Sequence, residues 1–471
     1  MHAPAINAAL LSRLFLLSVL LALMPNAGAN PYETTLANGM RVIVKEDHRA
    51  PTVAQVVWYR VGAMDETSGT TGVAHLLEHM MFKGTSAVGP GEFNRRVAAV
   101  GGQNNAFTTR DSTAYYEQVP AAALAEVMRL EADRMRHLTF DADEFARELK
   151  VVMEERRLRT DDQAQAKLAE QMRAVAFQAH PYRNPVIGWM SDLESMTVAD
   201  VRAWYERWYV PNNALLVIVG DVRHEDVFAL AAQTYGLLVP RELPLRRPQN
   251  EPEQAGIRRV TVQAPADLPV VLMAYKVPAL RDIERDVDPY ALEMLTAILD
   301  GHDAARLTRH LVREARVAQS VGVGYDAMAR GPALFLLMGS PAEGRTRADL
   351  EAALRAEIAR LVQQGVRADE LQRAKAQLIS GQVYRRDSMF AQAMEMGGLE
   401  MSRLRFDSTA RLVEKLKAVT AEQIRAAAAR YLVDGRLTVG ELDPQPLPAP
   451  SGHAQAMSGS PDALPVPGEV P

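Results

Sequence analysis

The chain has 471 residues, of which 48% are hydrophobic and 24% are charged, a balance typical of globular proteins. It carries 53 lysine and arginine residues against 58 aspartate and glutamate residues, so the net charge of −5 lacks the signature of a nucleic-acid-binding protein. Cysteine is absent, which excludes disulfides, a catalytic thiolate and thiolate metal ligands. Any metal must therefore be held by histidine, aspartate or glutamate.

The first 29 residues have the pattern of a secretory signal peptide. Arg13 supplies a positive charge, residues 14–24 form an apolar run, and residues 27–29 offer an A-x-A cleavage site. The apolar run is shorter than the roughly 20 residues that span a bilayer. We expect export to a bacterial periplasm, with secretion as the alternative. No stable membrane insertion is expected after cleavage, although an uncleaved interfacial anchor is a second interpretation.

The remaining chain predicts two successive α+β halves. For the first half the patterns predict strands at 32–36, 40–44 and 52–61, helices at 71–83 and 91–100, two strands within 103–120, helices over 121–208 and a strand at 214–219. For the second half they predict strands at 258–263 and 270–276, helices over 286–315, strands at 317–325 and 333–339, helices over 344–431 and a strand at 436–441.

A local repeat relates the two halves. Residues 197–203 and 420–426 match in their threonine and arginine positions, and a strand follows each, which indicates an internal duplication. The predicted fold class is α+β, with two related domains that each pack an antiparallel sheet against helices. The predicted divisions are a signal at 1–29, domains at 30–241 and 257–445, a Pro-rich linker at 242–256 and a disordered Pro/Gly/Ser-rich tail at 446–471.

Residues 75–79 read H-x-x-E-H within the predicted helix 71–83. His75 and His79 are four residues apart, so they share one helix face about 6 Å apart and can bind one ion. Glu78 leans toward the same face, where it can reach a water held at the metal. This is the inverted form of H-E-x-x-H, known as the inverzincin arrangement. In the alternative interpretation these are packed or solvated helix residues without a metal.

A zinc site of this kind needs a third ligand, because catalytic zinc usually has three protein ligands and one open position. The predicted helical segment 143–159 offers Glu148, Glu154 and Glu155. Glu148 and Glu155 are seven residues apart, which places them two turns apart on one helix face. One could bind the metal while the other orients a histidine or the substrate. Spacing alone does not choose between Glu154 and Glu155, and all three could belong to a solvated charged face.

Further segments in the same order resemble the pitrilysin/insulinase family of zinc metallopeptidases, which includes the mitochondrial processing peptidase β-subunit and bacterial exported homologues. The resemblance is carried by residues 72–85, 101–108, 113–116, 148–157, 180–188 and 208–214. It spans nearly the whole chain after the signal. It implies a clamshell of two related α+β domains, with zinc on the first. His302 and His310 lie at the roughly equivalent place in the second half, but they lack the i, i+4 spacing and a paired glutamate, so no metal site is expected there.

The resemblance also implies a role for each candidate residue. Glu155 matches the third zinc ligand beside His75 and His79, which gives one Zn²⁺ per chain with an open fourth position. Glu148 matches an assisting glutamate. Glu78 matches the general base, which takes a proton from water and passes it to the leaving amine. No other cofactor is expected.

A predicted edge strand follows the zinc-binding helix. Asn105, Ala106, Phe107 and Thr108 match the family's substrate-binding strand, to which an extended peptide would add through main-chain hydrogen bonds. Such binding explains a broad tolerance of substrate sequence. In the alternative interpretation the segment is an ordinary sheet strand with a polar face.

The second half departs from the family pattern at two positions. Many self-sufficient members carry an arginine and, seven residues later, a tyrosine that contact the substrate carbonyl. Here Val312 and Gln319 stand at those positions in an ungapped alignment. Arg313 or Arg316 could replace the arginine only through a register shift, and no tyrosine is near. We therefore expect a paralogous chain as heterodimer partner to supply these groups, with a homodimer as the alternative.

The expected function is an exported zinc-dependent endopeptidase that hydrolyses unstructured peptides or protein segments, as the zinc-bearing subunit of a two-chain enzyme. One alternative is a non-catalytic assembly subunit of the same family. Another is a peptide-binding clamshell with a structural zinc. The complete set of candidate catalytic residues argues against a pure scaffold, which has no chemical need for them.

Overall fold

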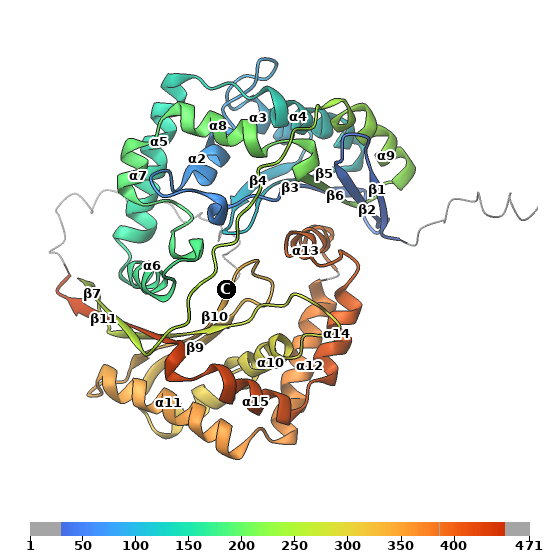
Figure 1. Ribbon diagram of the computed structural model, residues 1–471. Coiled ribbons are helices and arrows are strands. Elements are labelled where there is room, and N and C mark those ends of the chain that lie inside the picture. The colour runs from blue at the N-terminus through green and yellow to red at the C-terminus, as the bar shows by residue number, and fades with distance from the viewer. Residues whose placement is uncertain (1–29, 386, 448–471) are drawn as a thin grey trace, which may run out of the picture.

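The computed structural model describes residues 30–385 and 387–447, which form two α/β halves that face each other (Figure 1). The predicted signal at 1–29 and the tail from 448 onward lie outside the described residues. Residues 239–255, which cover most of the predicted linker, contain no helix or strand. Within the described part of the chain, no helix combines the length and the apolar character needed to cross a membrane.

The first half contains a six-stranded sheet with the order β1-β2-β6-β3-β5-β4. Its strands are β1 (Tyr32–Thr35), β2 (Arg41–Glu46), β3 (Thr52–Tyr59), β4 (Gln103–Thr108), β5 (Thr113–Pro120) and β6 (Ala214–Gly220). Its helices are α2 (Val73–Met80), α3 (Glu92–Ala99), α4 (Leu124–His137), α5 (Ala142–Arg156), α6 (Ala164–Ala176), α7 (Met190–Ser195), α8 (Val198–Trp208) and α9 (His224–Gln233).

The second half contains a five-stranded sheet with the order β7-β11-β8-β10-β9. Its strands are β7 (Arg258–Pro265), β8 (Val270–Val277), β9 (Ala318–Tyr325), β10 (Ala333–Pro341) and β11 (Leu437–Gln445). Its helices are α10 (Asp288–Asp300), α11 (Arg347–Gln364), α12 (Ala368–Arg385), α13 (Met389–Met401), α14 (Thr409–Ala418) and α15 (Ala421–Tyr431). The helical region predicted over 286–315 consists of α10, which ends at Asp300, and a separate π-helical turn at Thr308–Glu314.

The two sheets have the same topology, which confirms the predicted duplication. The order β2-β6-β3-β5-β4 recurs as β7-β11-β8-β10-β9, and the repeated segments form α8 and α15, each ahead of the last strand of its half. One feature differs from the expected antiparallel sheets, because β2 pairs with β6 and β7 with β11 in parallel. In each of these two pairs the chain passes through helices between one strand and the other, and crossover connections of this kind permit parallel pairing.

The halves also exchange equivalent helices (Figure 1). Helix α6 comes from the first half, yet it packs on β7 and β11 and places Leu168 and Met172 in the core of the second half. Helix α13 comes from the second half and packs on β3 and β6, where Met396 joins a core with Trp58. Each sheet thus gains an apolar cover from the other half, which buries area that would otherwise face water.

Polar contacts between the halves lie beside these helices. Arg330 of the second half donates from its main chain to Asp111 Oδ2 at 2.9 Å, and its Nη1 lies 3.3 Å from Asp65 Oδ2. The Tyr182 hydroxyl accepts a 2.8 Å hydrogen bond from the Gly331 amide. These partners are largely buried, so their loss would leave unpaired polar groups in a poorly hydrated contact.

Candidate metal centre and catalytic site

A glycine turn sets the start of α2, the helix that carries the H-x-x-E-H segment. Gly72 precedes the helix with φ of 87°, and a Cβ there would lie 2.6 Å from the Ile187 carbonyl oxygen. The backbone amides of Gly72 and Ala74 each donate to the Glu66 carboxylate at 2.9 Å. Glu66 therefore satisfies two amides that the first helical turn leaves without intrahelical partners. These contacts fix the position of the first turn of α2 within the first half.

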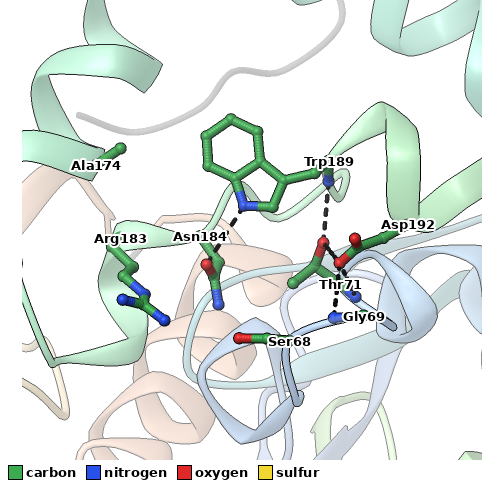
Figure 2. A pocket seen from close by; sticks show the side chains of 8 residues that line it. All are labelled: Ser68, Gly69, Thr71, Ala174, Arg183, Asn184, Trp189 and Asp192. Carbon is green, nitrogen blue, oxygen red and sulfur yellow. Dashed lines mark hydrogen bonds between the residues drawn. The ribbon is translucent and has the colours of Figure 1, made fainter.

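A pocket lies beside the same turn (Figure 2), lined by Ser68, Gly69, Thr71, Ala174, Arg183, Asn184, Trp189 and Asp192. Asp192 Oδ2 accepts hydrogen bonds from the Gly69 amide, the Thr71 amide and the Thr71 hydroxyl at 3.1, 3.0 and 2.7 Å. The Trp189 amide donates to the Thr71 hydroxyl at 3.0 Å. These contacts tie the turn before α2 to α7.

Helix α5 carries the carboxylates. The Asp141 side chain caps it by accepting from the Asp143 and Glu144 amides. At its other end buried Arg156 donates to both oxygens of Glu170 at 2.9 Å and to the Gly188 carbonyl at 2.8 Å. The helix then continues into a π-helical turn at Arg157–Asp161. The C-terminal end of α5 is thus held against neighbouring segments, and its N-terminal end is capped by its own flanking residue.

His75, His79 and Glu155 converge into one cluster whose ligand atoms all lie within 4.8 Å of one another. Glu155 Oε2 lies 3.8 Å from His75 Nε2 and 3.3 Å from His79 Nε2. Two ligands of a tetrahedral zinc at about 2.1 Å are about 3.4 Å apart, so these separations suit one ion. Glu154 points elsewhere, since it is 58% exposed and pairs with Arg157 at 3.0 Å.

The environment of His75 also fits a metal ligand. Its Nε2 faces Glu155 Oε2 at 3.8 Å, whereas its outer nitrogen, Nδ1, is buried without a hydrogen-bond partner. Burial lowers the pKa of His75 to about 4, with a further lowering from His79, so the imidazole is neutral at pH 7. Neutral imidazole is the form that binds metal. The donor set of two imidazoles and one carboxylate is the His₂Glu set of several catalytic zinc sites.

Glu148 lies behind His79. Its Oε2 is 3.2 Å from His79 Nδ1, and its Oε1 is 2.6 Å from Lys83 Nζ. A carboxylate on the outer nitrogen of a metal-binding histidine fixes the tautomer and the ring orientation. Glu148 therefore lies outside the three-residue cluster and contacts it through the side chain of His79, a candidate ligand.

Glu78 projects toward the same region from α2. Its Oε2 accepts a 2.5 Å hydrogen bond from the Thr108 hydroxyl of β4. Burial raises the pKa of Glu78 to about 7, although the Thr108 bond opposes this rise. A carboxylate whose pKa lies near neutrality is suited to accept and return a proton.

The predicted substrate strand forms an edge. β4 pairs with β5 on one side, and no described strand pairs with its other side. Asn105 is exposed, Ala106 packs partly against the core of the first half, and Phe107 meets Trp58 edge-on at 5.4 Å. Thr108 reaches Glu78 instead of facing solvent.

Two cations at the site were missing from the sequence-based prediction. Lys83 holds Glu148, and Arg159 holds Glu155 Oε1 at 2.8 Å, which leaves Glu155 Oε2 directed at the histidines. The spacing of Arg159 four residues after Glu155 could have indicated the second contact. Lys83 lies on a turn after α2, and nothing in its local spacing points to Glu148.

The second half supplies no comparable centre. Among residues 257–385 and 387–447, no three histidine, aspartate or glutamate side chains gather within metal-binding distance. Val312 lies on the π-helical turn and packs partly into the core, whereas Gln319 is exposed on β9. The exposed edge strand β9 thus carries a glutamine at the position where the family pattern has a tyrosine.

Family models match both halves of the chain. The model of the insulinase family, peptidase family M16, matches residues 41–189, and that of the peptidase M16 inactive domain matches residues 195–378. The zinc protease PqqE of Helicobacter pylori is 34% identical over 312 residues, which are 65% of this chain and 69% of that protein. An uncharacterized zinc protease of Mycobacterium tuberculosis is 30% identical over 89% of this chain and 94% of its own length.

Solved structures share the fold. A protease from Helicobacter pylori superposes with a TM-score of 0.83 at 27% identity, covering 88% of this chain and 99% of that chain. The periplasmic protease PqqL from Escherichia coli gives 0.76 at 19% identity, covering 95% of this chain and 52% of that chain, which bears on the fold alone. The molecule is thus a clamshell of two related α+β domains, with a candidate metal-ligand cluster on the first. The chain belongs to the insulinase family, peptidase family M16.

Proposed function

We propose that this chain is an exported zinc endopeptidase that hydrolyses unstructured peptides, with one Zn²⁺ held by His75, His79 and Glu155. The observation that carries the proposal is the convergence of these three side chains, with Glu78 beside them on α2. Relatives named zinc proteases support zinc as the ion. The His₂Glu donor set supports it on chemical grounds.

The bound ion would supply Lewis acidity toward the scissile carbonyl and would activate a water molecule for attack. Glu78 would accept the proton of the attacking water and return it to the leaving amine. Thr108 would keep the Glu78 carboxylate in place through its 2.5 Å hydrogen bond. Glu148 would hold the His79 ring in a single orientation, and the ion pair with Lys83 would hold Glu148 in place.

Substrate would bind as an added strand on the free edge of β4, along Asn105, Ala106, Phe107 and Thr108. Main-chain hydrogen bonds would supply much of the affinity, and they read little side-chain identity. The edge lies against α2, since β4 and α2 are in contact. A peptide on this edge would therefore run past Glu78.

The cellular compartment of the proposal is the periplasm, reached through a signal at residues 1–29. The apolar run and the A-x-A site of the sequence support export. A periplasmic protease among the structural neighbours is compatible with this location.

We also propose that the chain acts with a paralogous partner, or with a second copy of itself. Val312 is partly packed in the core, and Gln319 cannot provide a phenol. The match of residues 195–378 to an inactive domain fits a second half that carries no metal. The same match favours one other candidate function, a peptide-binding or assembly subunit without turnover.

Two measurements separate these functions. The purified chain is tested for bound zinc and for cleavage of a mixed peptide pool, with and without a chelator. Bound zinc that His79→Ala removes, together with chelator-sensitive cleavage, supports a peptidase that needs no partner. Zinc without cleavage points to a missing partner, which a pull-down identifies. Absence of zinc would contradict the metal centre and favour the assembly function.

In the matched variant Glu78→Gln, zinc binding and peptide capture should persist while turnover is lost. Turnover that survives this change would refute Glu78 as the base. If the unmodified chain and the Glu78→Gln variant capture peptide equally well and neither cleaves it, the result fits the assembly function.

A further inference from the structure

A second group of histidine and carboxylate side chains lies on the outer edge of the first half. Glu46 ends β2, while His224 and Glu225 begin α9, and one ligand atom from each lies within 4.8 Å of the others. In Figure 1 this edge, marked by β1, β2 and α9, lies across the first half from α2 and α5. It is therefore separate from the candidate catalytic centre.

The atom separations within this group are close to those around a single ion. His224 Nδ1 lies 3.4 Å from Glu225 Oε2 and, within hydrogen-bonding distance, 2.8 Å from Glu46 Oε1. Neighbouring ligands at about 2.1 Å from one ion are separated by about 3.0 Å in octahedral and 3.4 Å in tetrahedral geometry. The corresponding distances in the catalytic cluster are 3.3 and 3.8 Å.

A second histidine lies beside Glu46 but outside the three-residue cluster. His48 Nε2 lies 4.0 Å from Glu46 Oε2, and the other ring nitrogen, Nδ1, is held by Asp221 Oδ1 at 2.7 Å. His48 and Asp221 therefore add to the polar groups around Glu46.

The ring of His224 is also held in place. Tyr32 of β1 stacks on it with ring centroids 3.6 Å apart and planes 6° apart. The Glu46 carboxylate additionally accepts from the His224 amide at 2.8 Å, so it reaches α9 without any ion. Arg223 approaches Glu225 Oε2 at 3.7 Å and offsets part of the local negative charge.

Three carboxylates and two imidazoles meet at this edge, so a divalent cation would offset their charge. Imidazole together with carboxylate favours Zn²⁺ over Ca²⁺ or Mg²⁺, which prefer oxygen ligands alone. We infer that Glu46, His224 and Glu225 form a second zinc site that ties the end of β2 to the start of α9. This site would join the two elements and would take no part in peptide hydrolysis, because it lies across the first half from α2 (Figure 1).

The test counts zinc on an untagged full-length chain by equilibrium dialysis against buffered free zinc, followed by elemental analysis. A His75→Ala, His79→Ala background removes the first centre, so the second is observed alone. One zinc equivalent should remain in this background, and addition of zinc should raise its Tm, since a ligand that binds only the folded state stabilises it.

His224→Ala in that background should abolish the remaining equivalent, and Glu225→Gln should weaken its binding about tenfold. His137→Ala is the matched control, because His137 forms a comparable exposed pair with Asp133 at 2.9 Å without a third ligand. Circular dichroism verifies that each variant is folded.

The inference is overturned if the background chain binds no zinc up to about 100 μM, a range that a folded zinc site should saturate. It is also overturned if His224→Ala and Glu225→Gln both bind as His137→Ala does. The site does not rest on the proposed peptidase function. If the first centre fails and the second does not, the unmodified chain will bind a single zinc equivalent, and His224→Ala will remove that zinc.

Discussion

The Thr108 hydroxyl donates a 2.5 Å hydrogen bond to Glu78 Oε2, and it thereby joins the edge strand β4 to α2, the helix that carries two of the candidate zinc ligands. Thr108, the last residue of the edge strand, is thus in contact with Glu78, the candidate general base. A peptide that adds to β4 would lie directly against the group that moves the proton. Binding and catalysis would be coupled through one side chain.

Thr108→Val should lower kcat about 10- to 100-fold, because the isosteric change removes the donor that orients Glu78. Thr108→Ser keeps the hydroxyl and should retain most of the activity. Initial rates on a model peptide, with zinc content measured in parallel, check this. A Thr108→Val chain with kcat within about twofold of the parent would show that the contact does not position the base.

Lys83→Met should weaken zinc binding about tenfold, because Glu148 loses the cation that holds its outer oxygen and orients His79 less firmly. Glu148→Gln should weaken it about 10- to 100-fold. Competition with a chromogenic chelator measures both. Lys150→Met, an exposed change on the same helix as Glu148, serves as the control and should leave the affinity unchanged.

Gly397→Ala should destabilise the protein by about 1–3 kcal/mol through overpacking. A Cβ on Gly397 of α13 would lie 2.0 Å from Trp58 Nε1 of β3, so the helix could not keep its contact with the first sheet. A Cβ on the neighbouring Gly398 meets nothing within 4 Å. Gly398→Ala should therefore be neutral or stabilising by up to about 1 kcal/mol, since alanine favours helix. Urea unfolding of the two variants makes the comparison, and equal midpoints would contradict the packing of α13.

The stability contribution of Glu251 should depend on pH. Desolvation raises its pKa, but the hydrogen bond from Lys276 and those from the Gln178, Ala179 and His180 amides outweigh this effect and lower the pKa to about 2. Because the folded pKa lies below the ordinary value of 4.5, the stabilisation is present above pH 4.5. It is lost as pH falls toward 2.

Glu251→Gln should consequently cost about 1–3 kcal/mol at pH 7, and the difference from the parent should shrink between pH 4.5 and 2. Denaturant unfolding across this pH range measures the difference. Glu253→Gln, an exposed change in the same segment, is the control. A Glu251→Gln difference that stays constant down to pH 2 would show that the carboxylate charge is not what stabilises the contact.

The sequence by itself determined the local part of this protein. The spacing of His75, Glu78 and His79 places them on one helix face wherever the helix lies, since helical periodicity depends only on neighbours along the chain. The strands, the repeat of the two halves and the choice of Glu148 and Glu155 as candidates also followed from pattern and resemblance. Glu154 remained an alternative to Glu155 on spacing alone, and its exposed side chain now separates the two.

Only the tertiary structure decided the contacts between residues far apart in sequence. Thr108 meets Glu78, Lys83 meets Glu148, and His224 meets Glu46, each across two elements whose relative placement no local period encodes. The exchange of α6 and α13 between the halves belongs to the same class. An amphipathic helix shows in its sequence that it has an apolar face, but which sheet covers that face depends on how the whole chain buries its surface.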